Sequence, residues 1–331
     1  MKISVILPCY NGAATIAVQL EALANQQWGG KWELVVVNNG STDDSMKIVE
    51  QYRDRLPDLK IVQAHDFSKP RLGVAHSYNT GVKAASGDVF CFCEADDEVS
   101  PGWLAAMAEA LCLYDSVAGP LEYTRLNEPW LVAACNYGKW YQSEGLMDSD
   151  ISHPPHLPFS FGCNLGMKRS VYEAVGDFNL EVSTAWDADY CWRIQLAGFP
   201  LHFAPDAVVH YRLRHSYAAM YRQAQNWGWD HVPLLLRYSD RSFGWYTLLK
   251  ELVSMSSYLV SGIKLYLMST FNIRRGRGGF ALWCWGMGFK TGCIKSLLAN
   301  DLLPALFSKE RSGVLKPAVP PHGATKSLTR N

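Results

Sequence analysis

The chain has 331 residues, of which 48% are hydrophobic and 19% are charged. These proportions are ordinary for a chain that buries a core, which excludes disorder of the whole chain, and the length suits one large α/β domain with or without an appendage. The 31 basic residues balance 31 acidic ones. No global field therefore draws the protein to nucleic acid, and any basic surface must be local.

Targeting signals and cysteine chemistry are not indicated. The opening apolar stretch, residues 1–8, is too short for the core of a signal peptide and lacks a small-residue cleavage site. No run of about 18 uncharged apolar residues occurs, so we expect no membrane-spanning helix. The nine cysteines are scattered without CxxC spacing, which argues against a zinc site or a disulfide scaffold. We expect a cytoplasmic protein with reduced thiols.

The first hundred residues alternate two patterns. Short β-branched runs predict buried strands, and the stretches between them have the apolar spacing of helices. Strands that alternate with helices indicate βαβ units and a largely parallel sheet. The expected strands cover 3–7, 34–37 and 89–93, and the expected helices cover 14–25, 44–53 and 75–85.

Two helix starts carry local signals. Ser41, with Asp44 three residues later, resembles a capping box that opens the second helix. Ser100 precedes Pro101, which predicts a capped start for a helix over 103–113. The strand at 89–93 therefore ends in an acidic turn. In open α/β sheets the ligand crevice lies at the carboxyl ends of strands, and this turn sits there.

The rest of the chain is less regular. Prolines interrupt residues 120–160, and long irregular connections of this kind are often lids or acceptor loops. A second structured block covers 161–214. Beyond Tyr217 the pattern is helical and aromatic, and the last residues, 308–331, are rich in Pro, Gly, Ser and Lys, which predicts disorder.

The acidic turn is the first candidate site. With a two-residue strand period, Glu94 and Asp96 point to one side and Asp97 to the other. Two carboxylates on one side of a strand end can hold a hard divalent cation with open positions for phosphate oxygens. Such a cation bridges a diphosphate and neutralises the charge that grows as it leaves. Taken alone, a solvated acidic turn is the commoner explanation.

A second candidate follows the strand at 34–37. Asn38 and Asn39 run into a glycine turn and then into a helix start. Amide side chains offer both a donor and an acceptor to the edge of a nucleobase, and the helix start supplies free N–H groups. A turn held by its own Asn side chains, without a ligand, explains the same residues equally well.

Two further candidates lie later in the chain. A helix that starts near Trp186 would place Asp187 or Asp189 at its positive end, where an ionised carboxylate could take a proton from an acceptor hydroxyl. Helix capping is the alternative. His210 ends a short strand pattern and could be a third metal ligand, although a lone histidine there is more often only hydrogen-bonded.

In this order, these pieces resemble the family 2 glycosyltransferases, inverting enzymes with the GT-A fold. Residues 5–12 resemble that family's first strand and turn, and residues 38–43 resemble its Asp-Asn-Gly-Ser-Thr-Asp stretch. Glu94-Ala95-Asp96 stands where the family has its DxD metal motif. The resemblance covers about residues 3–215 and includes Gly73 through Asn79, Gly81, Gly87, Gly162-Cys163-Asn164, Gly176-Asp177-Phe178 and Trp186-Asp187.

The resemblance implies an α/β fold of the GT-A type: a Rossmann-like, mostly parallel central sheet flanked by helices, with a helical C-terminal appendage. We expect a glycosyltransferase domain over 1–215, with a nucleotide-sugar half at about 1–118 and an acceptor half at about 119–215. After this domain we expect a helical, membrane-associated extension over 216–307, and then the disordered tail over 308–331.

The resemblance also implies a reaction and a site. A sugar moves from a nucleotide-sugar donor to an acceptor hydroxyl with inversion, Mg²⁺ or Mn²⁺ is the cofactor, and Asp187 is the general base. The expected metal ligands are Asp96, Glu94 and His210. The expected nucleotide-sugar-binding residues are Pro8, Tyr10, Asn11, Asn38, Asn39, Ser41, Asn79, Glu94, Ala95 and Asp96, and the expected acceptor-side residues are Asn164, Trp186 and Asp189.

The sequence departs from the family pattern at Asn38, Tyr78, Glu94 and Trp186. Three of these departures, at Asn38, Glu94 and Trp186, favour an alternative: a catalytically silent protein that still binds nucleotide sugars. A sugar nucleotidyltransferase is a second alternative, but the glycine- and basic-rich loop that it needs near the amino terminus is missing. The expected acceptor is a saccharide or a lipid-linked sugar of cell-envelope or polysaccharide biosynthesis.

The carboxyl-terminal third leaves two interpretations open. Segments 245–268 and 280–298 mix aromatic and leucine side chains with lysines, and an arginine cluster at 274–277 lies between them. Amphipathic helices with basic flanks could rest on the inner face of the plasma membrane as a peripheral contact. A helical appendage packed on the catalytic domain explains the pattern equally well.

Overall fold

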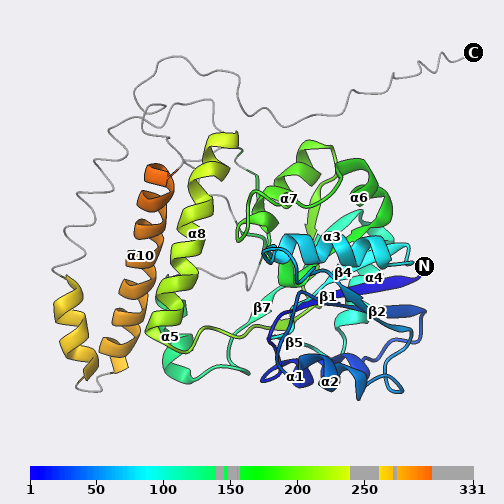
Figure 1. Ribbon diagram of the computed structural model, residues 1–331, viewed down its shortest axis with the longest axis horizontal. Coiled ribbons are helices and arrows are strands. Elements are labelled where there is room, and N and C mark those ends of the chain that lie inside the picture. Colours follow the sequence, from blue (N-terminus) through cyan, green and yellow to red (C-terminus); the bar gives the residue numbers. More distant parts are fainter. Residues whose placement is uncertain (139–144, 148–154, 156, 239–260, 271–273, 300–331) are drawn as a thin grey trace, which may run out of the picture.

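The computed structural model describes residues 1–138, 145–147, 155, 157–238, 261–270 and 274–299. In Figure 1 the first two-thirds of the chain surrounds a central sheet, and two long helices from the last third stand side by side next to it. The predicted tail over 308–331 and most of segment 245–268 lie outside the described residues, as do parts of the loop at 120–160.

The central sheet has seven strands in the order β3-β2-β1-β4-β8-β6-β9. The first four strands along the chain run parallel to one another, whereas β8 is antiparallel to both β4 and β6. The prediction of a mostly parallel sheet is therefore confirmed. The strands are β1 (Ile3–Cys9), β2 (Trp32–Asn38), β3 (Leu59–Gln63), β4 (Val89–Phe92), β6 (Ser116–Ala118), β8 (Leu165–Lys168) and β9 (Leu201–Phe203).

Both faces of the sheet are covered. Along β1, Val5 and Leu7 pack into one apolar cluster and Ile6 into the other, because successive side chains of a strand point to opposite faces. Strands buried on both sides read as continuous apolar runs, which is why the pattern of this sequence identified them. Figure 1 shows α1 and α2 on one side of the sheet and α3 on the other.

The helices of the sheet region lie close to their predicted positions. The first-turn residues Trp186 and Asp187 open α7, as expected, and α4 covers the predicted range. The helices are α1 (Ile16–Ala24), α2 (Ser45–Glu50), α3 (Val74–Ala84), α4 (Trp103–Leu113), α5 (Pro129–Gly138), α6 (Arg169–Val175) and α7 (Trp186–Leu196), with a 3₁₀ turn, η1, at Gly162–Asn164.

Two predicted caps are wrong. Helix α2 begins at Ser45 with Asp44 as its cap residue, and no side chain there makes a capping hydrogen bond. Ser41 instead accepts a hydrogen bond from the main-chain N–H of Asn11 at 3.1 Å. Helix α4 begins at Trp103, with Gly102 rather than Ser100 as its cap. The two serines that were predicted as caps, Ser41 and Ser100, therefore lie in the loops that precede the helices.

A second, smaller sheet was not predicted. It has three very short strands in the order β5-β10-β7, namely β5 (Glu98–Val99), β10 (Val209–His210) and β7 (Leu121–Glu122). A short strand that ends at His210 was expected and is β10, but the two residues of β5 or of β7 leave no alternation in a sequence, so only tertiary contact defines those strands. Because β5 directly follows the acidic turn and pairs with β10, this sheet holds the acidic turn close to residues 211–215, which follow β10.

The carboxyl-terminal helices pack closely on each other. Helix α8 (Tyr217–Tyr238) lies along α10 (Arg274–Ala299). A Cβ on Gly288 or Gly292 would collide with the main-chain carbonyl of Tyr221 or Gln225, so glycine lets the two backbones approach. The predicted helical appendage is thus present, and the arginine cluster at 274–277 forms the first turn of α10.

Residues 261–270 form a further helix, shown in gold in Figure 1. Its side chains at Ile263, Tyr266 and Leu267 are exposed by 68%, 54% and 53%, and their spacing places them on one face. Within the described residues, none of the helices is long and apolar enough to cross a membrane.

Candidate active site

A cavity of 780 Å³ opens at the carboxyl ends of β1 and β4, the edge where ligands bind in open α/β sheets. Several separate segments of the chain line it. The turn after β1 and the acidic turn after β4 form one side, and the start of α7 with residues 211–215 forms another. One face of α8 completes it. Of the predicted site residues, Pro8, Tyr10, Asn11, Asn39, Glu94, Ala95, Asp96, Trp186 and Asp187 line this cavity.

The acidic turn gathers three carboxylates. One ligand oxygen from each of Glu94, Asp96 and Asp97 lies within 4.8 Å of the others, a group that could hold a metal ion. The prediction that Asp97 points away from the other two is wrong. Strand β4 ends at Phe92, and residues 95–96 form a turn, so the alternation of a strand does not apply to them.

Asp97 is the buried member of this cluster, with 1% of its surface exposed. Its Oδ1 accepts the main-chain N–H of Arg212 at 2.8 Å, and its Oδ2 has no hydrogen-bond partner within the described part of the chain. Burial raises the pKa of Asp97 well above its ordinary value. Burial and then the charge of Asp96 raise the pKa of Glu94 to about 8. Burial and mutual repulsion therefore oppose the ionisation of this cluster, and a bound cation would favour its ionised form.

Two arginines from the segment after β10 reach the acidic turn. Arg214 places Nη1 2.8 Å from Oδ2 of Asp96, and Arg212 donates from Nε to the main-chain oxygen of Asp96 at 2.8 Å. Both arginines and His215 line the cavity. These residues bring positive charge to the place where the cluster faces the cavity.

Asp187 lies in the first turn of α7 and lines the same cavity. Its Oδ2 accepts the main-chain N–H of Gly162 at 3.1 Å, and its Oδ1 accepts the N–H of Ala188 at 2.9 Å. Burial raises its pKa to about 6, although both hydrogen bonds act in the opposite direction. The carboxylate is fixed in orientation and is more basic than an ordinary aspartate.

The turn after β1 forms another part of the cavity wall. Tyr10 is 47% exposed, and the guanidinium of Arg71 lies 3.7 Å from the centroid of its ring. Asn11 adopts a positive φ of 49°, and its Oδ1 accepts the N–H of Thr42 at 2.8 Å. This bond ties the turn after β1 to the turn after β2, so the two strand ends form one surface.

Asn38 and Asn39 have different roles. Asn38 accepts the N–H of Ser41 at 2.9 Å with its Oδ1, so it holds its own turn, and neither Asn38 nor Ser41 lines the cavity. Asn39 donates to the carbonyl of Leu72 at 3.0 Å, while its buried Oδ1 has no partner among the described residues. Of the two amides, Asn39 is therefore the one that lines the cavity and has an acceptor oxygen without a partner among the described residues.

Two other predicted asparagines serve the fold. Asn79 donates to and accepts from the main chain of Phe178, at 2.9 and 2.8 Å. Asn164 is fully buried and makes three hydrogen bonds, at 2.8 to 2.9 Å, with Trp103 Nε1 and with the carbonyls of Pro120 and Ala207. Neither lies among the described residues that line the cavity.

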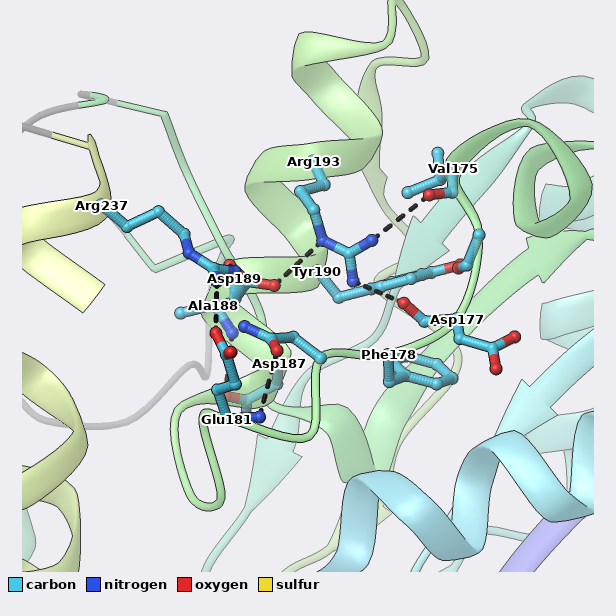
Figure 2. A network of polar contacts seen from close by, with 12 residues as sticks. Val175, Asp177, Phe178, Glu181, Asp187, Ala188, Asp189, Tyr190, Arg193 and Arg237 are labelled. Atoms are coloured by element: carbon cyan, nitrogen blue, oxygen red, sulfur yellow. Dashed lines mark hydrogen bonds and ion pairs between the residues drawn. The ribbon is translucent and has the colours of Figure 1, made fainter. Parts of the chain in front are cut away.

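His210 and Asp189 are also placed elsewhere. Nδ1 of His210 lies 2.7 Å from Glu122 Oε2 in the small sheet, away from the three-carboxylate group. Asp189 is fully buried and pairs with Arg193 at 2.9 Å and with Arg237 at 3.3 Å. Figure 2 shows Asp189 between these two arginines, where it joins α7 to α8. It anchors two helices and does not line the cavity.

Several cavity residues carried no signal in the sequence. They come from segments that only the fold brings together, and the most distant are on α8, where Trp227 stacks on Phe161 with ring centroids 6.0 Å apart. Single arginines in irregular segments match no motif, so a spacing argument does not find them. The unpredicted lining residues that carry charge or an aromatic ring are Arg71, Phe161, Tyr211, Arg212, Arg214, His215, Arg222 and Trp227.

Comparison with known sequences supports the resemblance found above. The sequence profile of glycosyl transferase family 2 matches residues 4–176, which is more than half of the chain. The chain belongs to this family. A second profile, glycosyl transferase family group 2, matches residues 95–295 and so extends over α8 and most of α10.

Curated relatives in this family are distant. Glycosyltransferase AglE of Haloferax volcanii is 29% identical over 209 residues, which are 62% of this chain and 65% of AglE. The poly(ribitol-phosphate) β-N-acetylglucosaminyltransferase TarS of Staphylococcus aureus is 38% identical over 105 residues, which are 30% of this chain and 17% of TarS. The chain therefore spans less than two-thirds of either relative.

Solved structures confirm the fold. The mannosyltransferase PcManGT from Pyrobaculum calidifontis, solved with GDP-Man and Mn²⁺, superposes with a TM-score of 0.54 at 21% identity, over 92% of this chain and 76% of PcManGT. S. aureus TarS superposes with a TM-score of 0.50 at 23% identity, over 68% of this chain and 39% of TarS. The GT-A fold expected from the sequence is thus confirmed.

Proposed function

We propose that the protein transfers a sugar from a nucleotide-sugar donor to an acceptor hydroxyl, with inversion at the anomeric carbon. One observation carries the proposal: Asp187 lines the same cavity as Glu94 and Asp96 of the three-carboxylate group, although Asp187 follows Asp96 by about 90 positions in the chain. A carboxylate of raised pKa beside a cluster suited to a cation is the pairing that this transfer requires.

The acidic cluster fits a divalent cation. Its three oxygens lie within 4.8 Å of one another, and the buried Oδ2 of Asp97 has no partner among the described residues. Carboxylate oxygens are the ligands that Mg²⁺ and Mn²⁺ prefer, so Glu94, Asp96 and Asp97 would hold the ion. When bound, the cation neutralises charge on the departing diphosphate. His210 is replaced by Asp97 in this proposed ligand set.

The donor would lie between the turns after β1 and β2 and the acidic turn. The unpartnered Oδ1 of Asn39 can accept an N–H from a nucleobase edge, and the exposed ring of Tyr10 offers a surface for stacking. Arg214 can pair with the diphosphate because its guanidinium already lies against the acidic turn. The GDP-Man bound to PcManGT belongs to the donor class that we propose.

Asp187 would act as the general base. Its carboxylate accepts the proton of the acceptor hydroxyl while the acceptor oxygen forms a bond to the anomeric carbon. The bond between that carbon and the diphosphate oxygen breaks, the electron pair leaves with the nucleoside diphosphate, and the anomeric configuration inverts. The N–H groups of Gly162 and Ala188 hold the carboxylate in one orientation during this step.

The cellular setting is part of the proposal. The exposed apolar side chains of the helix at 261–270, next to Lys264, support a peripheral contact with an anionic membrane surface. A saccharide or lipid-linked acceptor, a role in envelope or polysaccharide synthesis, a cytoplasmic location and the domain boundary at residue 215 remain predictions from the sequence.

The test is release of nucleoside diphosphate from a panel of nucleotide sugars in the presence of Mn²⁺. The wild-type protein should act on at least one donor, and Asp96→Ala should lose that activity. Asp206→Ala is the matched control, because this aspartate is exposed and does not line the cavity. No release from any donor, together with no Mn²⁺-dependent binding of any nucleotide sugar, would favour the catalytically silent alternative.

A further inference from the structure

Helix α8 makes a buried polar contact with the loop that precedes Asp187. Asp230 of α8 is 2% exposed, and all its contacts with this loop use a single oxygen, Oδ2. That oxygen accepts hydrogen bonds from Ser183 Oγ at 3.0 Å, from Thr184 Oγ1 at 2.7 Å and from the main-chain N–H of Thr184. Three donors on one buried carboxylate oxygen make a strong and directional contact.

The same turn of α8 offers Thr184 a second acceptor. Thr184 Oγ1 also lies 3.0 Å from the main-chain oxygen of Asn226, which is one helical turn before Asp230, so its single hydroxyl hydrogen is shared between this carbonyl and Asp230 Oδ2. Residues 183 and 184 are therefore held by one turn of a helix that is 42 to 47 positions away in the chain. Ser183, Thr184 and Asn226 all line the cavity.

This contact acts on Asp187 through a short path. Thr184 is three residues before Asp187, and the intervening Ala185 is the cap residue of α7. A shift of residues 183–184 would therefore move the first turn of α7, which carries the Asp187 carboxylate. Because catalytic groups must be held to within a fraction of an ångström, small displacements of this turn are costly.

A second contact between the same loop and α8 is an exposed ion pair. Arg237 of α8 pairs with Glu181 at 2.9 Å, and in Figure 2 Glu181 lies below Asp189 while Arg237 reaches toward it from the upper left. Glu181 is 77% exposed in this pair, so solvent screens the attraction and its contribution is small. The loop thus has one buried and one exposed link to α8, and the two can be removed separately.

We infer that Asp230 is a positioning residue for the transfer reaction, which holds residues 183–184 so that Asp187 faces the acceptor. The inference rests on the proposed function, since it assigns to α8 a part in setting the base of that reaction. It also makes α8 a component of the active site. The helix is then more than an appendage to the sheet domain.

The experiment compares four variants of the full chain with the wild type. Asp230→Ala removes the acceptor of all three hydrogen bonds, Asp230→Asn keeps a carbonyl oxygen in place, and Thr184→Val removes the hydroxyl from the other side. Glu181→Gln is the matched control on the same loop. For each, kcat and KM for transfer and the dissociation constant of the donor with Mn²⁺ are measured, along with amide hydrogen exchange over residues 183–188.

The inference expects kcat of Asp230→Ala to fall at least about tenfold, while the donor dissociation constant stays within about twofold. The kcat of Asp230→Asn should recover most of the wild-type value. The kcat of Thr184→Val should fall as that of Asp230→Ala does, and the kcat of Glu181→Gln should equal that of the wild type. Amides 183–188 should exchange faster in Asp230→Ala and in Thr184→Val, and at the wild-type rate in Glu181→Gln. If Asp230→Ala does not fold, Thr184→Val carries the same test.

Three results would overturn the inference: an unchanged kcat in Asp230→Ala, an equal loss in Asp230→Asn, or a fall in donor binding that matches the fall in kcat. The last result would mark a general structural role. If the wild type itself transfers no sugar, the proposed function fails. The positioning role in transfer then fails with it, and hydrogen exchange shows separately whether Asp230 holds the loop: faster exchange in Asp230→Ala supports that contact, and unchanged exchange overturns it.

Discussion

The main-chain N–H of Gly162 lies 3.1 Å from Oδ2 of Asp187 and donates a hydrogen bond to it. This bond joins the 3₁₀ turn before β8 to the first turn of α7, two elements that meet at the cavity. It fixes one oxygen of the carboxylate, while the Ala188 N–H binds the other. The proposed base is thus held by main-chain groups, which a side-chain substitution does not remove.

The reaction should depend on the ionisation of Asp187. Burial raises its pKa to about 6, so the carboxyl group is increasingly protonated below that pH and cannot accept a proton. We expect kcat/KM to be level near pH 8 and to fall about tenfold for each unit below pH 6. A pH–rate profile from 4.5 to 8, with circular dichroism at each pH to confirm folding, measures this. A rate that stays level to pH 4.5 would exclude a base with this pKa.

Arg214 should compete with a cation for Asp96. Its guanidinium lies 2.8 Å from the carboxylate that we propose as a metal ligand, and both side chains are partly exposed, at 41% and 28%. An ion pair of this kind is worth up to about 1 kcal/mol, so Arg214→Ala should bind Mn²⁺ up to about fivefold more tightly in the absence of donor. Calorimetric titration measures the affinity. Arg125→Ala is the control, because Arg125 pairs with Glu98 outside the cavity. Weaker Mn²⁺ binding in Arg214→Ala would contradict this account.

Asn164 should matter for stability rather than for ligand binding. Its side chain is fully buried and satisfies Trp103 and two carbonyl groups. Asn164→Ala would leave the buried Trp103 N–H and both carbonyls without this partner, at a cost of about 2–4 kcal/mol in the free energy of unfolding. Urea unfolding followed by fluorescence measures the change. A loss below about 0.5 kcal/mol, or weaker donor binding in a variant of unchanged stability, would restore Asn164 as a site residue.

The sheet and most of its helices could be predicted from the sequence, because buried strands leave continuous apolar runs and helices leave a periodic pattern. The three β1 residues Val5, Ile6 and Leu7 are buried on alternate faces for this reason. Strands of two residues, such as β5 and β7, carry no such pattern. They form only when distant segments meet, so the small sheet was missed.

In the candidate site, too, residues of local motifs could be predicted and residues that depend on distant contacts could not. Asp96 and Asp187 could be placed at one cavity because each belongs to a motif at the end of a strand or the start of a helix. The resemblance assigns Asn164 to the acceptor side, and the sequence alone does not distinguish a buried structural amide from a ligand-binding one. Arg214 and Asp230 were missed, since their partners lie 118 and 46 to 47 positions away and no local spacing predicts such contacts.

The central claim is that Asp187 is the base for sugar transfer in this cavity, and single-turnover transfer by Asp187→Asn tests it most directly. Donor and Mn²⁺ are bound first, with the donor dissociation constant measured in the same samples, and Asp206→Asn is the control. We predict a loss of about 10²- to 10⁴-fold in the transfer rate with donor affinity within about twofold of the wild type. Transfer at a rate within about threefold of the wild type would contradict the account and assign the base to another residue.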